Sequence, residues 1–380
     1  MSSKHEHKGM DRRTFLRVGS MGAIAAAAGA GAQETHGEIQ YRTLGRTGLK
    51  VSVVSMGAMR TFEAAIMQAA FDRGVNYIDT ARCYKNGLNE QVVGAALKGW
   101  RDKVTVATKC HMVTPQEDII ASVEESLKTM QIDCIDILQL HHPSPAETLH
   151  EDAKAALTKL REQGKIRFTG VTTHSDEVAV IDTVVTDPDK FYDMILVTYN
   201  FKDKEDKTAA IQRAAQAGLG VVAMKTQAGG YKTDTLGDVS PHQAALKWVL
   251  QHPGVHAAVP AMVNLDEVKE DTAVLRMDLK VSRAELEMLH RYDVATASRY
   301  CRRCNACSDT CPYGVDIATV NRSLMYAEGY RDVELACATY AEIPRAASLA
   351  ACGACSVCTA RCVCQVDIPS QIKRAQRLFC

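Results

Sequence analysis

Cysteine is concentrated near the end of this 380-residue chain, in a pattern suited to metal ligation. Only Cys83, Cys110 and Cys134 precede residue 300, although the chain contains 14 cysteines. Segments 301–312 (CRRCNACSDTCP) and 352–362 (CGACSVCTARC) repeat the spacing C-x2-C-x2-C-x3-C. Three thiolates at this spacing can wrap one face of an iron–sulfur cubane, whereas zinc ribbons use paired C-x2-C motifs. The repeat therefore predicts two 4Fe–4S clusters.

The ligands of each cluster are expected to come from both motifs. When two such motifs share one domain, the fourth cysteine of each motif ligates the cluster of the other. One cluster is assigned to Cys301, Cys304, Cys307 and Cys362, and the other to Cys352, Cys355, Cys358 and Cys311. The second motif lacks the usual proline and continues to Cys364, which is an alternative ligand to Cys362. Cys337 and Cys380 lie in no motif and are expected to be buried or free thiols.

Four polar residues of complementary chemistry lie at or just after the ends of three successive apolar runs. They are Asp79, Tyr84, Lys109 and His141. A free tyrosine titrates near about 10, and a neighbouring lysine cation lowers that pKa by favouring the phenolate. An aspartate would hold the lysine in place, and a neutral histidine can orient a carbonyl group. Each residue alone is commonly a cap or a structural side chain, but together they can protonate a carbonyl oxygen while hydride reaches its carbon. We therefore predict one shared pocket.

The apolar runs themselves predict eight buried strands that alternate with helices. They lie at 51–56, 75–80, 103–109, 134–141, 166–172, 194–199, 220–226 and 256–262. Amphipathic stretches of helical period separate them, most clearly at 117–130, 151–164 and 242–253. Eight such repeats predict a (β/α)8 barrel, in which function sits at the C-terminal ends of the strands. The alternative is an open doubly wound sheet, which is disfavoured because no G-x-G-x-x-G follows the first run. Residues 40–50 are expected to form a hairpin at the base of the barrel.

The sequence of residues 39–293 resembles the aldo-keto reductases. The stretches that carry the resemblance are GVNYIDTARCY, NEQVVGAALKGWRDKVTVATK, IDILQLHHP, GKIRFTGV and ALKWVLQHPGVHAAVPAM. The resemblance implies a (β/α)8 barrel that acts on a small carbonyl or alcohol substrate through an Asp–Tyr–Lys–His tetrad. The matching positions are Asp79, Tyr84, Lys109 and His141. His142 falls where many members have tryptophan, and it is the alternative histidine. A barrel followed by a helical two-cluster domain also resembles one branch of this family.

The resemblance further implies a nicotinamide cofactor, NAD(H) or NADP(H). The positions expected to contact it are Thr172, Thr173, Lys225 and Asn264. Several positions depart from the family pattern: threonines replace Ser-Asn, Leu196 replaces a glutamine, and Met224 replaces an aromatic residue. Glu267 stands where a cation usually binds the 2′-phosphate of NADP, and its charge would repel that phosphate. NAD is therefore favoured, and a weakened or absent nicotinamide site is the alternative.

The N-terminus has the layout of an export signal. Residues 1–17 are basic, residues 18–32 form an uncharged Ala/Gly-rich stretch, and Ala-Gly-Ala ends it as a cleavage pattern. The Arg12-Arg13 pair resembles a twin-arginine signal, and a disordered basic tail is the alternative. Because that route moves folded proteins, clusters can be inserted before export. We predict a signal peptide at 1–32, a barrel at 39–293 and a cluster domain at 294–380, in a protein exported to the periplasm.

The overall composition narrows the class of partner. The formal net charge is zero, so no nucleic-acid partner is predicted. The sequence contains no run of 18 or more strongly apolar residues, so no membrane-spanning helix is predicted. Nothing in the sequence indicates a particular oligomeric state. The favoured hypothesis is an exported oxidoreductase whose clusters exchange single electrons with a redox partner. The alternatives are an electron-transfer or binding subunit whose barrel has lost nicotinamide-dependent catalysis, and a NAD-dependent reductase with purely structural clusters.

Overall fold

The computed structural model describes residues 37–112, 115–231, 236–302, 304–355 and 357–379. The predicted signal peptide at 1–32 and Cys380 lie outside the described residues. From Gly37 onward the chain forms one compact unit, which includes both the barrel and the cysteine-rich region.

Eight parallel strands form the barrel predicted from the apolar runs. They are β3 (Met56–Gly57), β4 (Tyr77–Asp79), β5 (Thr105–His111), β6 (Ile135–His141), β7 (Ile166–Thr173), β8 (Met194–Thr198), β9 (Gly220–Met224) and β10 (Ala257–Ala258). Each strand pairs with the next along the chain. The sheet closes where Val54 bridges to Ala258 and where the N–H of Gly57 donates to the carbonyl of Pro260 at 2.9 Å. This closure confirms the barrel and excludes the open doubly wound sheet.

The first apolar run is divided between two elements, which corrects its assignment to one barrel strand at 51–56. β1 (Tyr41–Thr43) and β2 (Lys50–Ser52) form an antiparallel hairpin, which therefore extends past residue 50. The run is apolar throughout because both parts are buried. Val51 and Leu44 pack with side chains of the barrel interior and cover one end of it. A side chain at Gly220 would come within 2.6 Å of Leu44, so this close approach requires glycine.

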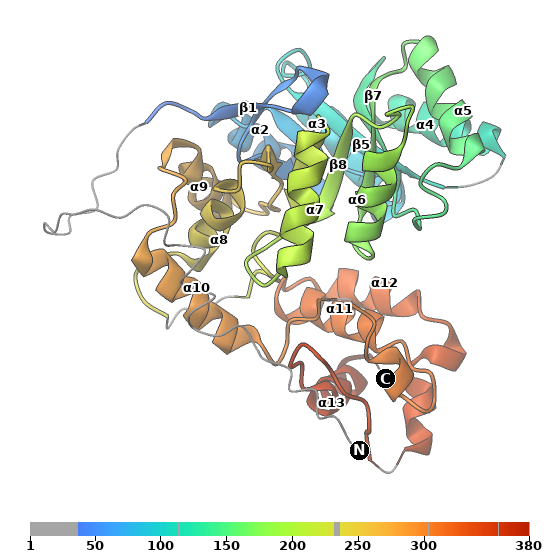
Figure 1. The fold of residues 1–380 in the computed structure, drawn as a ribbon, viewed down its shortest axis with the longest axis vertical. Coiled ribbons are helices and arrows are strands. Elements are labelled where there is room, and N and C mark those ends of the chain that lie inside the picture. The colour runs from blue at the N-terminus through green and yellow to red at the C-terminus, as the bar shows by residue number, and fades with distance from the viewer. Residues whose placement is uncertain (1–36, 113–114, 232–235, 303, 356, 380) are drawn as a thin grey trace, which may run out of the picture. The chain divides into compact units, whose positions relative to one another are not determined.

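Helices surround the strands, as Figure 1 shows. They are α2 (Ala64–Asp72), α3 (Leu88–Ala96), α4 (Gln116–Met130), α5 (Glu151–Glu162), α6 (Glu177–Thr186), α7 (Glu205–Gln216), α8 (Pro241–Leu250) and α9 (Leu265–Ala273), with 3-10 turns η1 (Gly45–Thr47), η2 (Ala58–Arg60), η3 (Tyr84–Gly87) and η4 (Val274–Arg276). In α4, Ile119, Val123 and Leu127 recur at helical spacing and are buried, and Gln131 ends the helix in the left-handed conformation. None of the helices that the structure describes has both the length and the apolar character needed to cross a membrane.

The chain leaves the barrel through a helical C-terminal region. Its elements are α10 (Arg283–Thr296), η5 (Ser308–Thr310), α11 (Ile317–Glu328), α12 (Val333–Ala341), η6 (Arg345–Ala347), η7 (Leu349–Ala354) and α13 (Ile368–Phe379). The predicted boundary between residues 293 and 294 falls inside α10. One apolar cluster joins Val320 of α11 to Ile372 of α13 and to several motif cysteines. A second cluster joins Tyr326 of α11 to Phe201 and Tyr231, which follow barrel strands.

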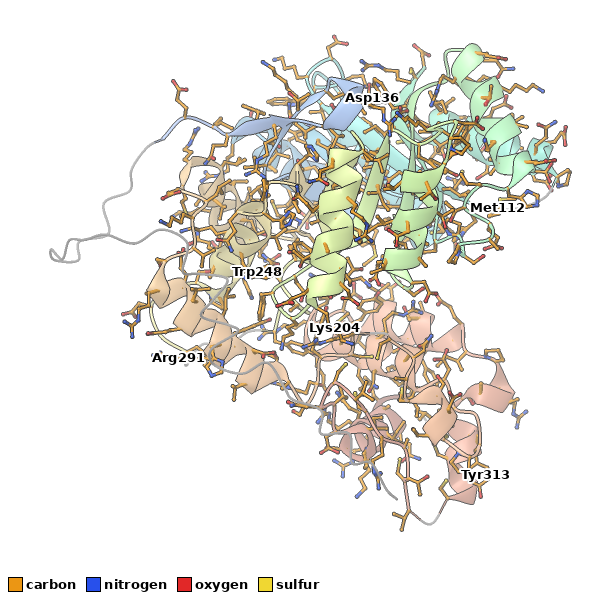
Figure 2. The ribbon with its side chains drawn as sticks, viewed as in Figure 1. Met112, Asp136, Lys204, Trp248, Arg291 and Tyr313 are labelled. Atoms are coloured by element: carbon orange, nitrogen blue, oxygen red, sulfur yellow. The ribbon has the colours of Figure 1, made fainter. Side chains whose placement is uncertain are left out.

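The two ends of the barrel differ in what they present. Figure 2 shows Asp136 and Lys204 toward opposite ends. Asp136, near the start of β6, pairs with Arg101 at 2.9 Å and with Arg167 at 2.6 Å. Lys204 follows β8 and directly precedes α7. The polar residues predicted to share a pocket belong to the end where Lys204 lies, because they occupy or follow the C-terminal ends of β4, β5 and β6.

Candidate active site

A buried lysine organises the floor of the candidate site. Lys109 is only 2% exposed, and its ammonium group donates to a carboxylate oxygen of Asp79, to the carbonyl of Thr80 at 2.6 Å and to the hydroxyl of Tyr84 at 3.2 Å. The amide of Gln139 donates to the other Asp79 oxygen at 2.6 Å. Burial opposes the charge on Lys109, but Asp79 and Tyr84 together outweigh burial, so the pKa of Lys109 is raised. The floor therefore holds a charged lysine beside a tyrosine hydroxyl.

Tyr84 begins the short turn η3, five residues after the end of β4. The next two residues, Lys85 and Asn86, have positive φ angles of 49° and 53°, so the chain reverses sharply there. Burial raises the pKa of Tyr84 to about 12, although Lys109 acts to lower it. This corrects the expectation that Lys109 lowers the pKa of Tyr84 below its ordinary value. Below pH 12 the phenol keeps its proton, and it can donate that proton to a substrate oxygen.

His141 ends β6 and lines a cleft that Asp79 and Tyr84 also line. Its ring centroid lies 6.1 Å from that of Tyr84, at nearly a right angle. Burial, with help from the positive charge of Lys109, lowers the pKa of His141 to about 2, so the imidazole is neutral. His142 stacks on His141 with a centroid distance of 4.4 Å and also lines the cleft. The structure thus brings Asp79, Tyr84, Lys109 and His141 together, with His142 beside them.

The four residues expected to hold a nicotinamide nucleotide fall into two pairs. Lys225 and Asn264 line the cleft, whereas Thr172 and Thr173 are buried and do not line it. The side-chain oxygen of Asn264 accepts from the N–H of Glu267 at 2.9 Å and caps α9. The hydroxyl of Thr173 bonds within its own turn to Ser175. Lys225 and Asn264 therefore share the cleft, and the two threonines are set apart from it.

One wall of this cleft is acidic. Asp266, Glu267, Glu270 and Asp271 all line it. Burial raises the pKa of Asp271 to about 8, and the nearby Glu270 and Glu267 push in the same direction, while His242 opposes them. A cluster of carboxyl groups repels a phosphate monoester. This wall therefore suits a neutral ribose better than a 2′-phosphate.

The C-terminal region supplies another wall, which the sequence patterns did not indicate. Tyr326 and Tyr330 line the cleft of about 870 Å³ together with the barrel residues. The guanidinium of Arg60 lies 4.5 Å above the ring of Tyr330 and donates to the carbonyl of that residue. Gly329 lies so close to the carbonyl of Gly229 that a side chain there would clash with it. No local sequence motif predicts this wall, because it forms by packing between segments that are far apart in the sequence.

Three further side chains at this end were also missed: Cys83, His111 and His174. The sulfur of Cys83 lies 3.5 Å from Nδ1 of His141. The ring of His111 is centred 4.7 Å from that of His141. His174 follows β7 directly, and its ring is centred 3.5 Å from that of His142. The sequence could have identified two of them, because His111 and His174 stand at or just after the ends of predicted strands, as His141 does.

The cysteine loops draw sulfur atoms from both motifs into one neighbourhood. Burial raises the pKa of the Cys307 thiol, and the neighbouring Cys362 and Cys304 add to that rise. The loops touch where the N–H of Arg361 donates to the hydroxyl of Thr310 at 3.0 Å. Cys311, Cys352, Cys358 and Cys362 pack against the same apolar cluster as Cys307. No disulfide joins any cysteine in the part of the chain that the structure describes. An all-sulfur donor set drawn from two loops fits an iron–sulfur cluster with ligands from both motifs.

The choice between Cys362 and Cys364 as a ligand stays open. The N–H of Cys364 donates to the sulfur of Cys362 at 3.2 Å, so the two residues are adjacent. Both are half-buried. Cys337, outside the motifs, is exposed on α12.

Comparisons with known proteins find similarity to aldo-keto reductases. A model of the aldo/keto reductase family matches residues 55–236, a range that ends before the cysteine-rich region. Methylglyoxal reductase YeaE of Escherichia coli is 29% identical over 62% of this chain and 85% of that protein. L-galactose dehydrogenase of Arabidopsis thaliana is 35% identical over 36% of this chain and 49% of that protein. The chain spans about half the length of several curated relatives that it matches.

Comparison with solved structures also finds similarity to aldo-keto reductases. An aldo-keto reductase from Klebsiella pneumoniae in complex with NADPH is 26% identical, with a TM-score of 0.57, over 67% of this chain and 95% of that chain. The holo form of aldo-keto reductase AKR11C1 from Bacillus halodurans is 24% identical, with a TM-score of 0.58, over 67% of this chain and 96% of that chain. The second likeness bears on the fold alone.

Proposed function

We propose that this chain is an aldo-keto reductase that interconverts a small carbonyl compound and its alcohol. The observation that carries this proposal is the buried Lys109, which joins Asp79 to the hydroxyl of Tyr84 at the floor of a cleft. A charged lysine at that place has an evident chemical use. It stabilises the phenolate that Tyr84 becomes after donating its proton.

The residues of the floor divide the work of carbonyl reduction. Tyr84 donates its hydroxyl proton to the carbonyl oxygen, and Lys109 compensates the charge left on the phenolate. Asp79, itself held by Gln139, keeps Lys109 charged and in position. Neutral His141 hydrogen-bonds the carbonyl group and orients it. A bound nicotinamide would supply the hydride that the carbonyl carbon receives.

We propose NADH as the preferred nucleotide. Lys225 and Asn264 lie where they can contact it in the cleft. Glu267 and its acidic neighbours disfavour the 2′-phosphate of NADPH. The related protein from Klebsiella pneumoniae was solved with NADPH, so this preference is a property we assign to this chain's own cleft.

We further propose that the eight motif cysteines hold two 4Fe–4S clusters that connect the barrel to a one-electron partner. The hydrogen bond between Arg361 and Thr310 and the apolar cluster that both loops share support the exchange of ligands between the motifs. When NADH formed by alcohol oxidation is reoxidised to NAD⁺ and a proton, two electrons are released, and the two clusters could accept one each. Export by the twin-arginine route belongs to this proposal, and it rests on the sequence of residues 1–32.

The proposed activity can be tested with cluster-loaded protein under anaerobic conditions. NADH or NADPH is supplied with a panel of small carbonyl compounds, and nucleotide oxidation is followed. Tyr84→Phe removes only the hydroxyl, so turnover should fall by about 10³-fold while nucleotide binding and iron content stay unchanged. Unchanged turnover in Tyr84→Phe would refute the catalytic assignment.

A second candidate is an electron-transfer or binding subunit whose barrel no longer uses a nicotinamide. It is favoured by Thr172 and Thr173, which do not line the cleft, and by Asn264, whose amide already caps α9. The two candidates differ in how the clusters are reduced. Bleaching of cluster absorbance by NADH supports the enzyme, whereas reduction by dithionite alone supports the subunit. Turnover without any change in the clusters would instead indicate that their role is structural.

A further inference from the structure

A group of metal-ligating side chains surrounds His141 at the mouth of the cleft. We propose that Cys83, His111 and His141 form a binding site for one zinc ion. Each residue offers one ligand atom, and the three atoms lie within 4.8 Å of one another. The residues come from three neighbouring places in the barrel: the turn after β4, the end of β5 and the end of β6. Their convergence thus follows from parallel strand order, since residues far apart in sequence end at one rim.

The distances suit zinc before any ion is placed. Zinc binds thiolate sulfur at about 2.3 Å and imidazole nitrogen at about 2.0–2.1 Å, which in a tetrahedron separates the two ligand atoms by about 3.6 Å. The sulfur of Cys83 and Nδ1 of His141 are 3.5 Å apart. The ring of His111 is centred 4.7 Å from the ring of His141. Two of the ligand atoms therefore already stand at the required separation, and the third is close by.

The type of ligand selects the class of metal. One sulfur and two nitrogens suit zinc, whereas magnesium and calcium require oxygen ligands. Structural zinc sites use four protein ligands, but sites that act on substrates use three and leave one position open. Cys83, His111 and His141 all line the cleft, so the open position is available to water or to a substrate oxygen.

A second group shares His141 and competes with this assignment. It consists of His141, His142 and His174, whose ligand atoms also lie within 4.8 Å of one another. We assign the ion to the first group because a thiolate is the stronger zinc ligand and because the Cys83–His141 separation already matches. Binding itself does not depend on the proposed function. If that function holds, the ion takes over from His141 the polarisation of the carbonyl.

The test uses the full chain with its clusters loaded, washed with a chelator and then supplied with zinc. Zinc K-edge X-ray absorption reports only on zinc, so the iron clusters do not interfere. The expected result is one bound equivalent with one sulfur and two nitrogen neighbours. Cys83→Ser should remove the sulfur neighbour. Cys83→Ser and His111→Gln should each weaken binding by about 100-fold or more, because losing a direct ligand costs more than the 10–100-fold typical of residues that only hydrogen-bond to a ligand.

Matched variants separate the possible outcomes. Cys134→Ser removes a half-buried thiol near the start of β6, away from the cleft, and should leave binding unchanged. Tyr84→Phe should lower turnover by about 10³-fold but keep the zinc, so failure of the proposed function would not mimic failure of the site. Three or four sulfur neighbours would place the ion in the cysteine motifs and overturn the proposal. So would loss of binding in His142→Gln or His174→Gln with none in Cys83→Ser, or no binding at all.

Discussion

The floor of the barrel and the C-terminal cysteine loops hold their reactive side chains in different ways. On the floor, Asp79, Lys109, Tyr84 and Gln139 bind one another directly, in a place almost closed to water. In the loops, most of the motif cysteines lie half-buried against a small apolar cluster. The first arrangement is complete from the polypeptide alone, whereas the proposed clusters would complete the second.

This difference has an energetic reason. A buried ion pair is costly to leave half-made, so the floor resists any change that removes one partner. A small domain whose ligands converge on a metal takes much of its folding free energy from that metal. The two regions should therefore fail differently, and the following experiments exploit that contrast.

If the motif cysteines hold the proposed clusters, removing the clusters should have the largest effect, and that effect should be confined to one region. A bound metal can contribute on the order of 10 kcal/mol to the folding of a small domain. After anaerobic removal of iron with a chelator, hydrogen exchange should become fast in peptides covering 301–316 and 349–367. Peptides from β5 and β6 serve as the internal control and should exchange as before. Equal loss of protection in the barrel would contradict the contrast.

Lys109→Met should damage the floor in both stability and rate. The variant leaves the buried carboxylate of Asp79 without its cation, which should lower the free energy of unfolding by about 3–5 kcal/mol. Carbonyl reduction should fall by about 10³-fold or more, because the phenolate of Tyr84 loses its counter-charge. Urea unfolding and steady-state kinetics measure the two effects.

The double variant Asp79→Asn/Lys109→Met sharpens this test. It removes both charges, so most of the lost stability should return while the rate stays low. A single Lys109→Met variant as stable as the wild type would show that the pair is not the anchor of the floor.

The pH profile should depend on the direction of the reaction. Burial raises the pKa of Tyr84 to about 12, so the proton needed for carbonyl reduction is present at every ordinary pH and that rate should be flat. Alcohol oxidation needs the phenolate, whose fraction rises about tenfold per pH unit below the pKa. Oxidation should therefore climb steadily from pH 7 to 10. An inflection near the ordinary pKa of histidine would contradict the neutral state of His141, whose pKa is lowered to about 2.

The smallest effect is expected at the junction between the two regions. Arg60→Met removes the guanidinium that stacks on Tyr330 and donates to its carbonyl. We expect a loss of about 1–2 kcal/mol, from one cation–π contact and one hydrogen bond. Chemical denaturation measures it, and Arg46→Met, at an exposed position in the hairpin turn, is the control. Equal stability of both variants would show that Tyr330 is held by other contacts.

The sequence predicted the barrel because burial leaves a pattern in it. The runs at 134–141 and 166–172 fall within a residue of β6 and β7, whose side chains are mostly buried. The run at 51–56 was misassigned because an apolar pattern reports burial and not backbone pairing. Val51 is as buried as a barrel residue, yet its backbone pairs with Arg42 in the hairpin.

The candidate site was predictable only where strand order determines it. Asp79, Lys109 and His141 converge because parallel strands end at one rim. The pKa of Tyr84 was not predictable, since it depends on burial by residues far away in the sequence, and burial outweighs Lys109. The wall formed by Tyr330 could not be foreseen for the same reason. The assignment of eight cysteines to two clusters stays a prediction.

The apolar cluster that joins Tyr326 to Phe201 and Tyr231 bears on how such a protein can be taken apart or recombined. A barrel cut after Thr296 would keep Asp79, Tyr84, Lys109 and His141. It would also present an aromatic patch to water and lose one wall of its cleft. Replacing the C-terminal region by an unrelated domain would therefore leave a barrel with an exposed aromatic patch and an incomplete cleft, unless that face changed at the same time. The barrel and the C-terminal region therefore depend on each other structurally. A design that changes one must keep, or also redesign, the aromatic face that contacts the other.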